Sequence, residues 1–488
     1  MPYRPRSQPI EKLKQSMRTH HDVVIIGAGI TGLATAWWLH KAGIDVVLLE
    51  RDPMVGGTMK TEHDGEWLIE TGPNSALETT PLLKAISADV GIAHELLYAN
   101  DAADNRYILR NGVLHPLPMA PGLFLTSRLW SLPGKLRLLK EPFIGRASKE
   151  ETIAEFVSRR LGKEFLDYAI NPFVAGVYAG NPEQLSVQAA FPKLYALEKK
   201  YGGLIKGQIL GARERKKRAE KAKDRSRLFS YERGMQTLPD AIGKALGSRV
   251  HVGTNVERVT APRENGETQG GLYGIAATQN DKKISVTANA VILAVPSYIA
   301  STIIEHLDIP LATSLKNIYY PPVAEVFLGF RQKDIQRRLD GFGFLIPSKE
   351  NRKILGTIWS STLFQSRAPA GHAALTSFVG GSRQPELAAH NDDELTNLVM
   401  EELQSIMRIV GRPIYSRVKR WEKAIPQYRI GHLDSVKSME EFESRHRGMF
   451  LSGNYRGGIA VGDCIINSEI VSNRVKTFLA ETMNVISV

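Results

Sequence analysis

The residues of this 488-residue chain that most clearly point to chemistry are three glycines followed by a carboxylate. Gly27, Gly29 and Gly32 fit the pattern G-x-G-x-x-G, and Glu50 follows them. Glycines at these positions allow a tight turn, a close approach of backbone to a pyrophosphate and close packing of helix on strand. A carboxylate at Glu50 can accept hydrogen bonds from ribose hydroxyls. The combination predicts binding of a dinucleotide whose ribose carries no extra phosphate.

The sequence around these glycines predicts the β-α-β unit that would position them. Val23 to Ile26 is a short apolar run typical of a buried strand, Leu33 to Lys41 indicates a helix, and Asp45 to Leu49 indicates a second strand. The N-terminus of such a helix presents free N–H groups to phosphates. Residues 23–39 carry no charge, but their three glycines and short length exclude a transmembrane helix.

Three more turns are suited to contact the same ligand. Gly56-Gly57-Thr58 lets backbone pass close to a flat or charged group, and residues 72–75 (GPNS) form a polar turn. Met449 to Tyr455 predicts a strand that ends in a turn, and residues 456–465 open a last helix. The dipole of that helix would stabilise negative charge on a reduced flavin ring. These turns favour a flavin over a nicotinamide.

The composition is that of an ordinary globular protein with more than one domain. Hydrophobic residues make up 43% and charged residues 23%, and the length exceeds what one core supports. The single cysteine, Cys464, excludes an intrachain disulfide and a cysteine-cluster metal site, so no metal site is predicted. Residues 320–430 mix β-like runs with a helix, which suggests a strand-rich substrate domain.

The formal net charge of +12 is concentrated in two segments. Residues 1–20 carry five basic residues and one acidic residue, and residues 213–227 carry nine and three. A local basic patch predicts contact with an anionic membrane surface or an acidic partner, and a solvated helix face is the alternative. Nucleic acid is disfavoured because no aromatic residues interleave with these charges. The apolar, proline-rich residues 116–142 either pack internally or present an apolar patch beside the basic run.

From about residue 21 to its end, the sequence resembles the flavin-containing monoamine-oxidase-like superfamily and, within it, the protoporphyrinogen oxidase family. The motifs that carry the resemblance are GAGITGLATAWWL (27–39), GPNS (72–75), GVYAGNPEQLSVQAAFPKL (176–194), GFGFLIP (341–347), GTIWSSTLFQSRAP (356–369), IPQYRIGHLD (425–434) and GNYRGGIAVGDCI (453–465). Residues 176–194 are the most family-specific. The resemblance implies FAD as cofactor and, in haem biosynthesis, oxidation of protoporphyrinogen IX to protoporphyrin IX by three flavin cycles, with oxygen or another electron acceptor.

The resemblance also implies a mixed α/β and α+β fold in three parts: a discontinuous Rossmann-type FAD domain, a strand-rich substrate domain and a helical membrane-associating insertion. The implied boundaries are 1–20 for a flexible basic extension (or a short targeting segment), 21–80, 229–300 and 431–488 for the FAD domain, 81–109 and 301–430 for the substrate domain, and 110–228 for the insertion. The expected location is cytoplasmic, peripherally associated with the membrane, and a homodimer is left open.

The resemblance assigns roles to particular residues. Arg106 matches an arginine that pairs with a substrate propionate, and its fork suits a carboxylate. Phe342, Gly343 and Leu345 match residues that pack on the macrocycle, Phe364 matches an aromatic that stacks on a pyrrole ring, and Asn74 matches a polar residue near the flavin. The implied cofactor contacts are, in chain order, Gly27, Gly29, Gly32, Glu50, Arg51, Gly57, Thr58, Gly72, Val256, Trp421, Gly453, Asn454, Val461, Gly462 and Ile465. No histidine–carboxylate pair stands out, so no general acid or base is assigned.

Three alternatives remain. The same fold can act on coproporphyrinogen III, but four carboxylates would need more cations, and the apolar residues 341–345 favour the diacid. Another flavin amine oxidase or a desaturase is possible, but residues 176–194 count against it. A flavin-free, membrane-bound binding protein of the haem pathway would keep the fold, but the intact glycines and Glu50 argue against it.

Overall fold

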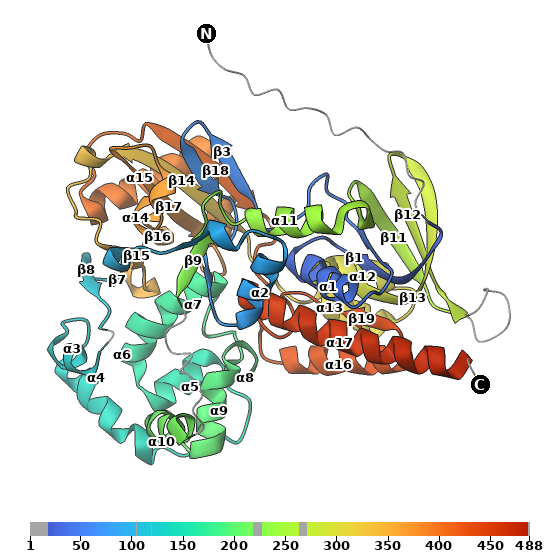
Figure 1. Cartoon of the computed structure of the whole chain (residues 1–488). Coiled ribbons are helices and arrows are strands. Elements are labelled where there is room, and N and C mark those ends of the chain that lie inside the picture. Colours follow the sequence, from blue (N-terminus) through green and yellow to red (C-terminus); the bar gives the residue numbers. More distant parts are fainter. Residues whose placement is uncertain (1–17, 104, 119, 218–226, 263–270, 487–488) are drawn as a thin grey trace, which may run out of the picture.

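The structure, a computed structural model, describes residues 18–103, 105–118, 120–217, 227–262 and 271–486. Figure 1 shows three lobes: one sheet with its helices at the right, a second sheet at the upper left, and a helical lobe at the lower left. Residues 1–17 of the predicted extension and residues 218–226 of the basic run lie outside the described residues.

The first sheet combines strands from three separate parts of the chain. Its order is β10-β2-β1-β13-β12-β11, with β19 paired to β13. The parallel strands are β1 (His20–Ile26), β2 (Val46–Leu49), β10 (Val250–His251), β13 (Lys282–Leu293) and β19 (Met449–Leu451). An antiparallel hairpin, β11 (Thr254–Thr260) and β12 (Tyr273–Gln279), completes it. The predicted unit of strand, glycine turn, helix and strand is therefore present.

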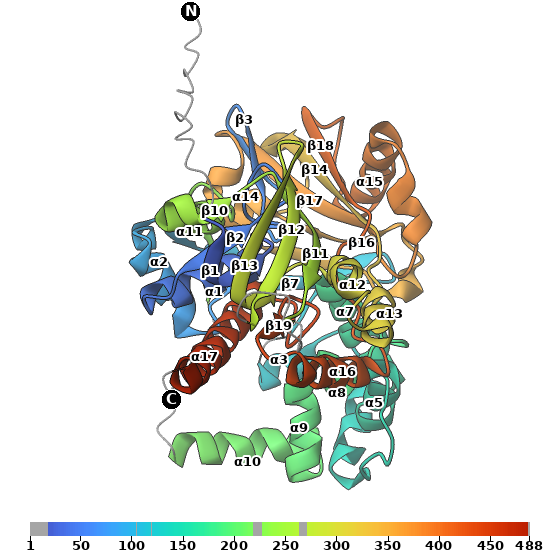
Figure 2. The ribbon, with the colours of Figure 1, turned by 90° about the vertical axis from the view of Figure 1, so that its right-hand side faces the viewer.

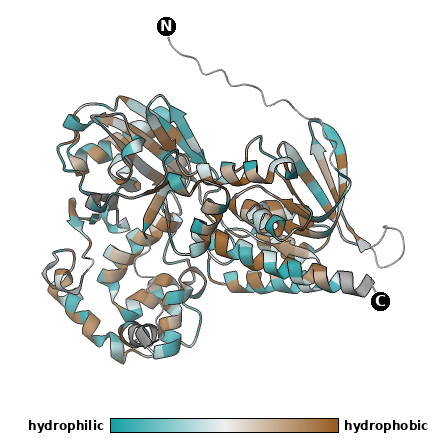
Figure 3. Ribbon diagram, in the orientation of Figure 1, coloured by the Kyte–Doolittle hydropathy of each residue, from teal (hydrophilic) through white to brown (hydrophobic). Residues whose placement is uncertain are grey.

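Helices cover both faces of this sheet, which explains why its central strands are continuously apolar (Figure 3). One face packs against α1 (Ile30–Lys41), α2 (Pro81–Asp89), α11 (Thr237–Leu246) and α17 (Val461–Ile486). The other packs against α12 (Ser297–Ile304), α13 (Ile309–Lys316) and α16 (His432–Arg445). The predicted boundaries at 81 and 301 placed α2 and α13 in the substrate domain. Their apolar side chains instead complete the core of the first sheet.

The second sheet has the order β18-β14-β17-β16-β15-β7-β8. Its strands are β7 (Asn105–Arg110), β8 (Val113–Pro116), β14 (Val323–Arg331), β15 (Gly341–Leu345), β16 (Ile354–Ile358), β17 (His372–Gly380) and β18 (Tyr415–Trp421). One face packs against α15 (Asp392–Met407). The sheet continues past the predicted boundary at 109 because Asn111 and Gly112 both have positive φ and form a two-residue hairpin turn between β7 and β8.

Helices between residues 121 and 217 form the third lobe. They are α3 (Pro121–Thr126), α4 (Leu132–Arg137), α5 (Ile153–Arg160), α6 (Lys163–Phe165), α7 (Asn171–Tyr178), α8 (Val187–Ala190), α9 (Pro192–Tyr201) and α10 (Leu204–Lys217). Arg160 is fully buried and pairs with Glu141 at 3.2 Å and Glu198 at 2.6 Å. The helices α9 and α10 lie at the base of the molecule, away from both sheets (Figure 2). In the described part of the chain, every helix is too short or too polar to cross a membrane.

Two smaller sheets lie between the lobes. The hairpin of β3 (Thr61–Asp64) and β4 (Trp67–Glu70) leads into the GPNS turn. The strands β5 (Ala76–Leu77), β6 (Leu96–Tyr98) and β9 (Leu228–Tyr231) form the other, in which β9 lies between β5 and β6. These connections bring the end of the helical segment back beside the first sheet.

Candidate active site

The three N-terminal glycines lie between the end of β1 and the start of α1, and each has a different surrounding. Gly27 has φ +104°, and a Cβ atom there would lie 2.7 Å from the Ala294 carbonyl oxygen. A Cβ atom at Gly32 would overlap the Gly27 carbonyl oxygen. At Gly29, by contrast, a Cβ atom would meet no atom within 4 Å. The space in front of the α1 N-terminus is therefore open at the residue where a pyrophosphate needs to approach the backbone.

Two further glycine turns pack directly on this one. Gly56 forms a parallel bridge with Gly29, and its N–H donates to the Ala28 carbonyl at 2.8 Å. A Cβ atom at Gly57 would lie 3.2 Å from the Gly29 Cα, and one at Gly72 would overlap the Thr58 carbonyl oxygen. The predicted residues Gly57, Thr58 and Gly72 therefore extend one continuous backbone surface from the first turn.

Glu50 follows β2 and points its carboxylate at the first glycine turn. The carboxylate accepts hydrogen bonds from the N–H groups of Ala28, at 2.6 Å, and Asp52, at 2.8 Å. The Glu50 carbonyl accepts from Thr254 N–H at 2.7 Å, which brings β11 and the half-buried Val256 to the same end of the sheet. The side chain of Arg51, the next predicted contact, is 65% exposed here. These residues fit the ribose end of a dinucleotide.

The C-terminal turn approaches the same place from the other side. Val461 and Ile465, near the start of α17, share a hydrophobic cluster with Ala28 and α1. Trp38 of α1 donates its indole N–H to Ser468 Oγ of α17 at 3.1 Å. The helix α1 is thereby packed against the first half of α17. Gly462 of the α17 N-terminus has room only for a hydrogen, because a Cβ atom there would overlap Thr79 Oγ1.

Tyr428 holds the turn between Gly453 and Gly458, a role that the sequence did not reveal. Its buried hydroxyl donates to the Asn454 carbonyl at 2.6 Å and accepts from the Gly458 N–H at 3.0 Å. Burial raises the pKa of Tyr428 well above its usual range, so the hydroxyl keeps its proton for the first bond. The only signal was an aromatic inside the motif at 425–434.

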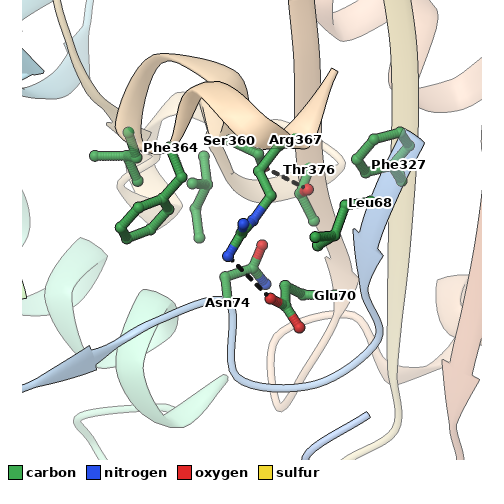
Figure 4. A pocket seen from close by; sticks show the side chains of 10 residues that line it. Leu68, Glu70, Asn74, Phe327, Ser360, Phe364, Arg367 and Thr376 are labelled. Atoms are coloured by element: carbon green, nitrogen blue, oxygen red, sulfur yellow. Dashed lines mark hydrogen bonds and ion pairs between the residues drawn. The ribbon is translucent and has the colours of Figure 1, made fainter. Parts of the chain in front are cut away.

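A pocket opens between the GPNS turn and the second sheet (Figure 4). Its lining residues are Leu68, Glu70, Asn74, Phe327, Ile358, Ser360, Leu363, Phe364, Arg367 and Thr376. Asn74 donates its side-chain N–H to the Gly72 carbonyl at 3.2 Å, so it lies between the Gly72 turn and the rest of the pocket. The two predicted residues Asn74 and Phe364 therefore line the same pocket.

The predicted substrate residues lie along the neighbouring strands. Gly343 of β15 pairs in register with Arg106 of β7, and the Arg106 guanidinium lies 5.8 Å from the ring centroid of Phe342. Phe342 and Phe364 belong to the same hydrophobic cluster. Leu345 lies farther along β15 and fills the space beside Gly176 of α7, where a Cβ atom would approach it to 2.5 Å. Four of the five residues thus lie close together on β7, on β15 and after α14 (Ser360–Leu363), and Leu345 lies farther along β15 toward the helical lobe.

Trp421, the remaining predicted cofactor residue, contacts the turn through its indole. Its N–H donates to the Thr71 carbonyl at 2.8 Å. Just before this turn, Glu70 forms a buried ion pair with Arg367 at 3.3 Å and accepts hydrogen bonds from Thr61 Oγ1 and Met235 N–H. Burial raises the pKa of Glu70 to about 7, although these partners oppose the shift. Neither Glu70 nor Arg367 was predicted, since 297 positions separate them.

The fold and this site define a flavin-dependent oxidoreductase. The chain belongs to the flavin containing amine oxidoreductase family, whose model matches residues 30–476. This confirms the predicted family, the enzymatic class and FAD as the cofactor, and the glycine turns and Glu50 are the residues that fit it.

Individual relatives are more specific. The chain is 35% identical to a chloroplastic protoporphyrinogen oxidase of Oryza sativa subsp. japonica, over 95% of this chain and 90% of the relative. It is 31% identical to a coproporphyrinogen III oxidase of Bacillus subtilis, over 94% of this chain and 98% of the relative. Among solved structures, reduced UDP-galactopyranose mutase superposes with a TM-score of 0.70 at 15% identity, covering 94% of this chain and 96% of that one. That last likeness concerns the fold alone.

Proposed function

We propose that this chain oxidises protoporphyrinogen IX to protoporphyrin IX with bound FAD. The observation that carries the proposal is a guanidinium, that of Arg106, beside an aromatic cluster that reaches the pocket through Phe364. Arg106 is exposed and has no ion pair with any residue that the structure describes. The names of the relatives support the same reaction.

The chemistry needs few side chains beyond those that position the substrate. FAD, when bound, supplies a hydride acceptor. Arg106 would pair with a propionate, and Phe342 and Phe364 would pack on the flat tetrapyrrole. Asn74 would contact the flavin from the turn that also carries Gly72. The protein then acts by orienting the macrocycle and excluding water from the reaction.

The distribution of cations favours the diacid over the tetracarboxylate coproporphyrinogen III. The other arginine of β7, Arg110, is already paired with Glu164 at 2.7 Å and lies over the ring of Tyr168. Among the described residues of this strand, Arg106 is therefore the guanidinium left for a substrate carboxylate. Because two relatives are named coproporphyrinogen III oxidase, coproporphyrinogen III remains the alternative substrate.

The test is aerobic turnover of the purified holoenzyme on both porphyrinogens in parallel, followed by porphyrin fluorescence and the flavin spectrum. Faster formation of protoporphyrin is the expected result. Preference for coproporphyrinogen would keep the cofactor and the fold but replace the substrate. Flavin reduction by neither compound would refute the tetrapyrrole assignment.

We also propose that the helical lobe contacts a membrane peripherally. Its surface over α3, α4 and the following 3₁₀ turn, η3 (Leu138–Phe143), carries large apolar side chains whose exposed fractions are between 53% and 89%. These side chains, which we call the α3–η3 face, are Leu123, Leu125, Leu132, Leu136, Leu139 and Phe143. The exposed Arg128 and Lys140 interleave with them. Apolar and basic side chains on one short segment suit insertion into the interface of an anionic bilayer.

The two proposals above assign a role to each of the three lobes. The first sheet, with its glycine turns, would be the FAD domain, the second sheet the substrate domain, and residues 121–217 the membrane-associating part. A homodimer stays a prediction.

A further inference from the structure

A second buried carboxyl group, Glu325, lies behind the candidate active site and has no role in the reaction described above. It is the third residue of β14 and is 7% exposed. Successive side chains of a strand point to opposite faces, so Glu325 shares a face with Phe327, which lines the pocket. Its Oε2 atom is buried and has no hydrogen-bond partner among the described residues.

An unpartnered carboxyl oxygen in a core is unfavourable, and an apolar residue would avoid its cost. Burial is the largest influence on Glu325, and the negative charge of Glu70 is the next; both raise its pKa well above the usual value. The Trp421 indole and the Lys419 ammonium oppose them. Burial and the charge of Glu70 therefore both favour the protonated form of Glu325.

The surroundings connect this pair to the cofactor turn. Glu70 comes two residues before Gly72 in the chain, and Trp421 donates to the intervening Thr71 carbonyl. Lys419 lies opposite Glu325 across the β14–β18 pair, and its ammonium lies 4.7 Å from the Trp421 ring centroid. Arg367 completes the group by pairing with Glu70. The charged groups that face the pair are therefore Lys419 from β18 and Arg367 from the turn after α14 (Ser360–Leu363).

We propose that Glu325 is a positioning residue that holds a proton behind the Thr71–Gly72 turn, and thereby sets the charge that the bound flavin experiences. With the proton in place, the charges of Glu70 and Arg367 cancel. Loss of the proton leaves one uncompensated negative charge behind the Thr71–Gly72 turn. Such a charge opposes the addition of electrons to the flavin and lowers its reduction potential.

The experiment compares the wild-type holoenzyme with Glu325→Gln, in which the amide reproduces the shape of the protonated acid. The reduction potential of the bound flavin is measured by spectroelectrochemistry across pH, without any porphyrinogen. The matched control is Glu422→Gln, the same change at an exposed neighbour of Trp421. At low pH the bound flavin should have the same reduction potential in all three proteins. As the pH rises, the flavin reduction potential of the wild type and of the control should fall by an additional amount that Glu325→Gln does not show. This additional fall should be about 30 mV, which corresponds to about a tenfold change in the ratio of reduced to oxidised flavin.

Lys419→Met provides an independent test of the proposal if Glu325→Gln fails to fold or loses flavin. Removing the ammonium should move the transition to higher pH, because Lys419 favours the ionised form of Glu325. The proposal is overturned if Glu325→Gln keeps the wild-type pH dependence of the potential, or if it alters only thermal stability. An unmoved transition in Lys419→Met also overturns it. Since no substrate is used, none of these outcomes depends on which porphyrinogen is oxidised.

Discussion

Replacing Gly29 by alanine separates the cofactor role of the glycine motif from its role in folding. Gly29 has φ −68° and ψ 172°, which any residue adopts, and a Cβ atom there would meet no protein atom within 4 Å. Alanine is a poorer N-cap than glycine by roughly 0.5–1 kcal/mol, but it also lowers the entropy of the unfolded chain by about 0.4–1 kcal/mol. The two effects nearly cancel, so Gly29→Ala apoprotein should unfold within about 1 kcal/mol of the wild type.

The effect on FAD should be much larger. The new methyl group would occupy the open space in front of the α1 N-terminus and keep the pyrophosphate from the backbone N–H groups. Losing one or two charged hydrogen bonds costs about 1.5–3 kcal/mol each, which corresponds to a Kd for FAD at least about tenfold higher. Gly32→Ala should behave differently, since its Cβ atom would overlap the Gly27 carbonyl oxygen and destabilise the apoprotein itself.

The assay combines thermal unfolding of the apoproteins with FAD titration followed by flavin fluorescence. Gly122→Ala is the matched control, because its Cβ atom also meets no atom within 4 Å but lies in α3, far from the cofactor turns in Figure 1. An unchanged FAD affinity in Gly29→Ala would refute the assignment of this space to the pyrophosphate. A large loss of apoprotein stability in the same variant would refute the claim that the space is empty.

Three further predictions follow from single contacts. Arg106→Ala should lower kcat/KM about 10- to 100-fold, mainly through KM, with Arg106→Lys in between because it keeps the charge but loses the fork; unchanged steady-state kinetics would remove Arg106 from the substrate site. Tyr428→Phe should lower the free energy of unfolding by about 1–3 kcal/mol and speed FAD release, because both turn contacts lose a buried partner; retained stability and slow release would contradict this. The double variant Phe143→Ser, Leu125→Ser should bind anionic vesicles at least about tenfold more weakly in sedimentation, whereas Ile470→Ser on α17 should bind them like the wild type. Equal binding by all variants would exclude the α3–η3 face as the membrane contact. Binding that is insensitive to salt would exclude a contribution from the basic residues of that face.

The Glu70–Glu325 pair also predicts a pH dependence of stability. Folding raises the pKa of both groups, so their protonated forms are favoured in the native state. The stability that this preference contributes is complete below the pKa of an unfolded glutamate, about 4.3, and is lost as the pH rises through the native pKa, which is about 7 for Glu70. In denaturant titrations, Glu325→Gln should lose less stability than the wild type between pH 5 and pH 8. A parallel decline of both proteins would show that folding does not raise the pKa of Glu325.

Local sequence alone determined the nucleotide-binding unit. The strand, the three glycines, the helix and Glu50 lie within about thirty residues, and their requirements are properties of the backbone: a positive φ at Gly27, and the absence of a side chain at Gly29 and Gly32. For the same reason the turn before α17 was predicted correctly. The β7–β8 hairpin was missed although its Asn-Gly turn is a local signal, so that boundary was open to sequence reasoning.

Tertiary structure alone decided which charged and polar groups meet. Glu70 and Arg367 form their ion pair across 297 positions, and Tyr428 reaches the Gly453–Gly458 turn from a different segment. Glu325 lies in an apolar-looking strand, and nothing in its neighbours along the chain shows that its face turns toward the pocket. Side-chain pairing depends on how the two sheets and the connecting turns pack, and burial, which decides the charge of such groups, exists only once they have packed. The sequence determined what the protein can bind, and the packing decided the electrostatic environment in which it binds.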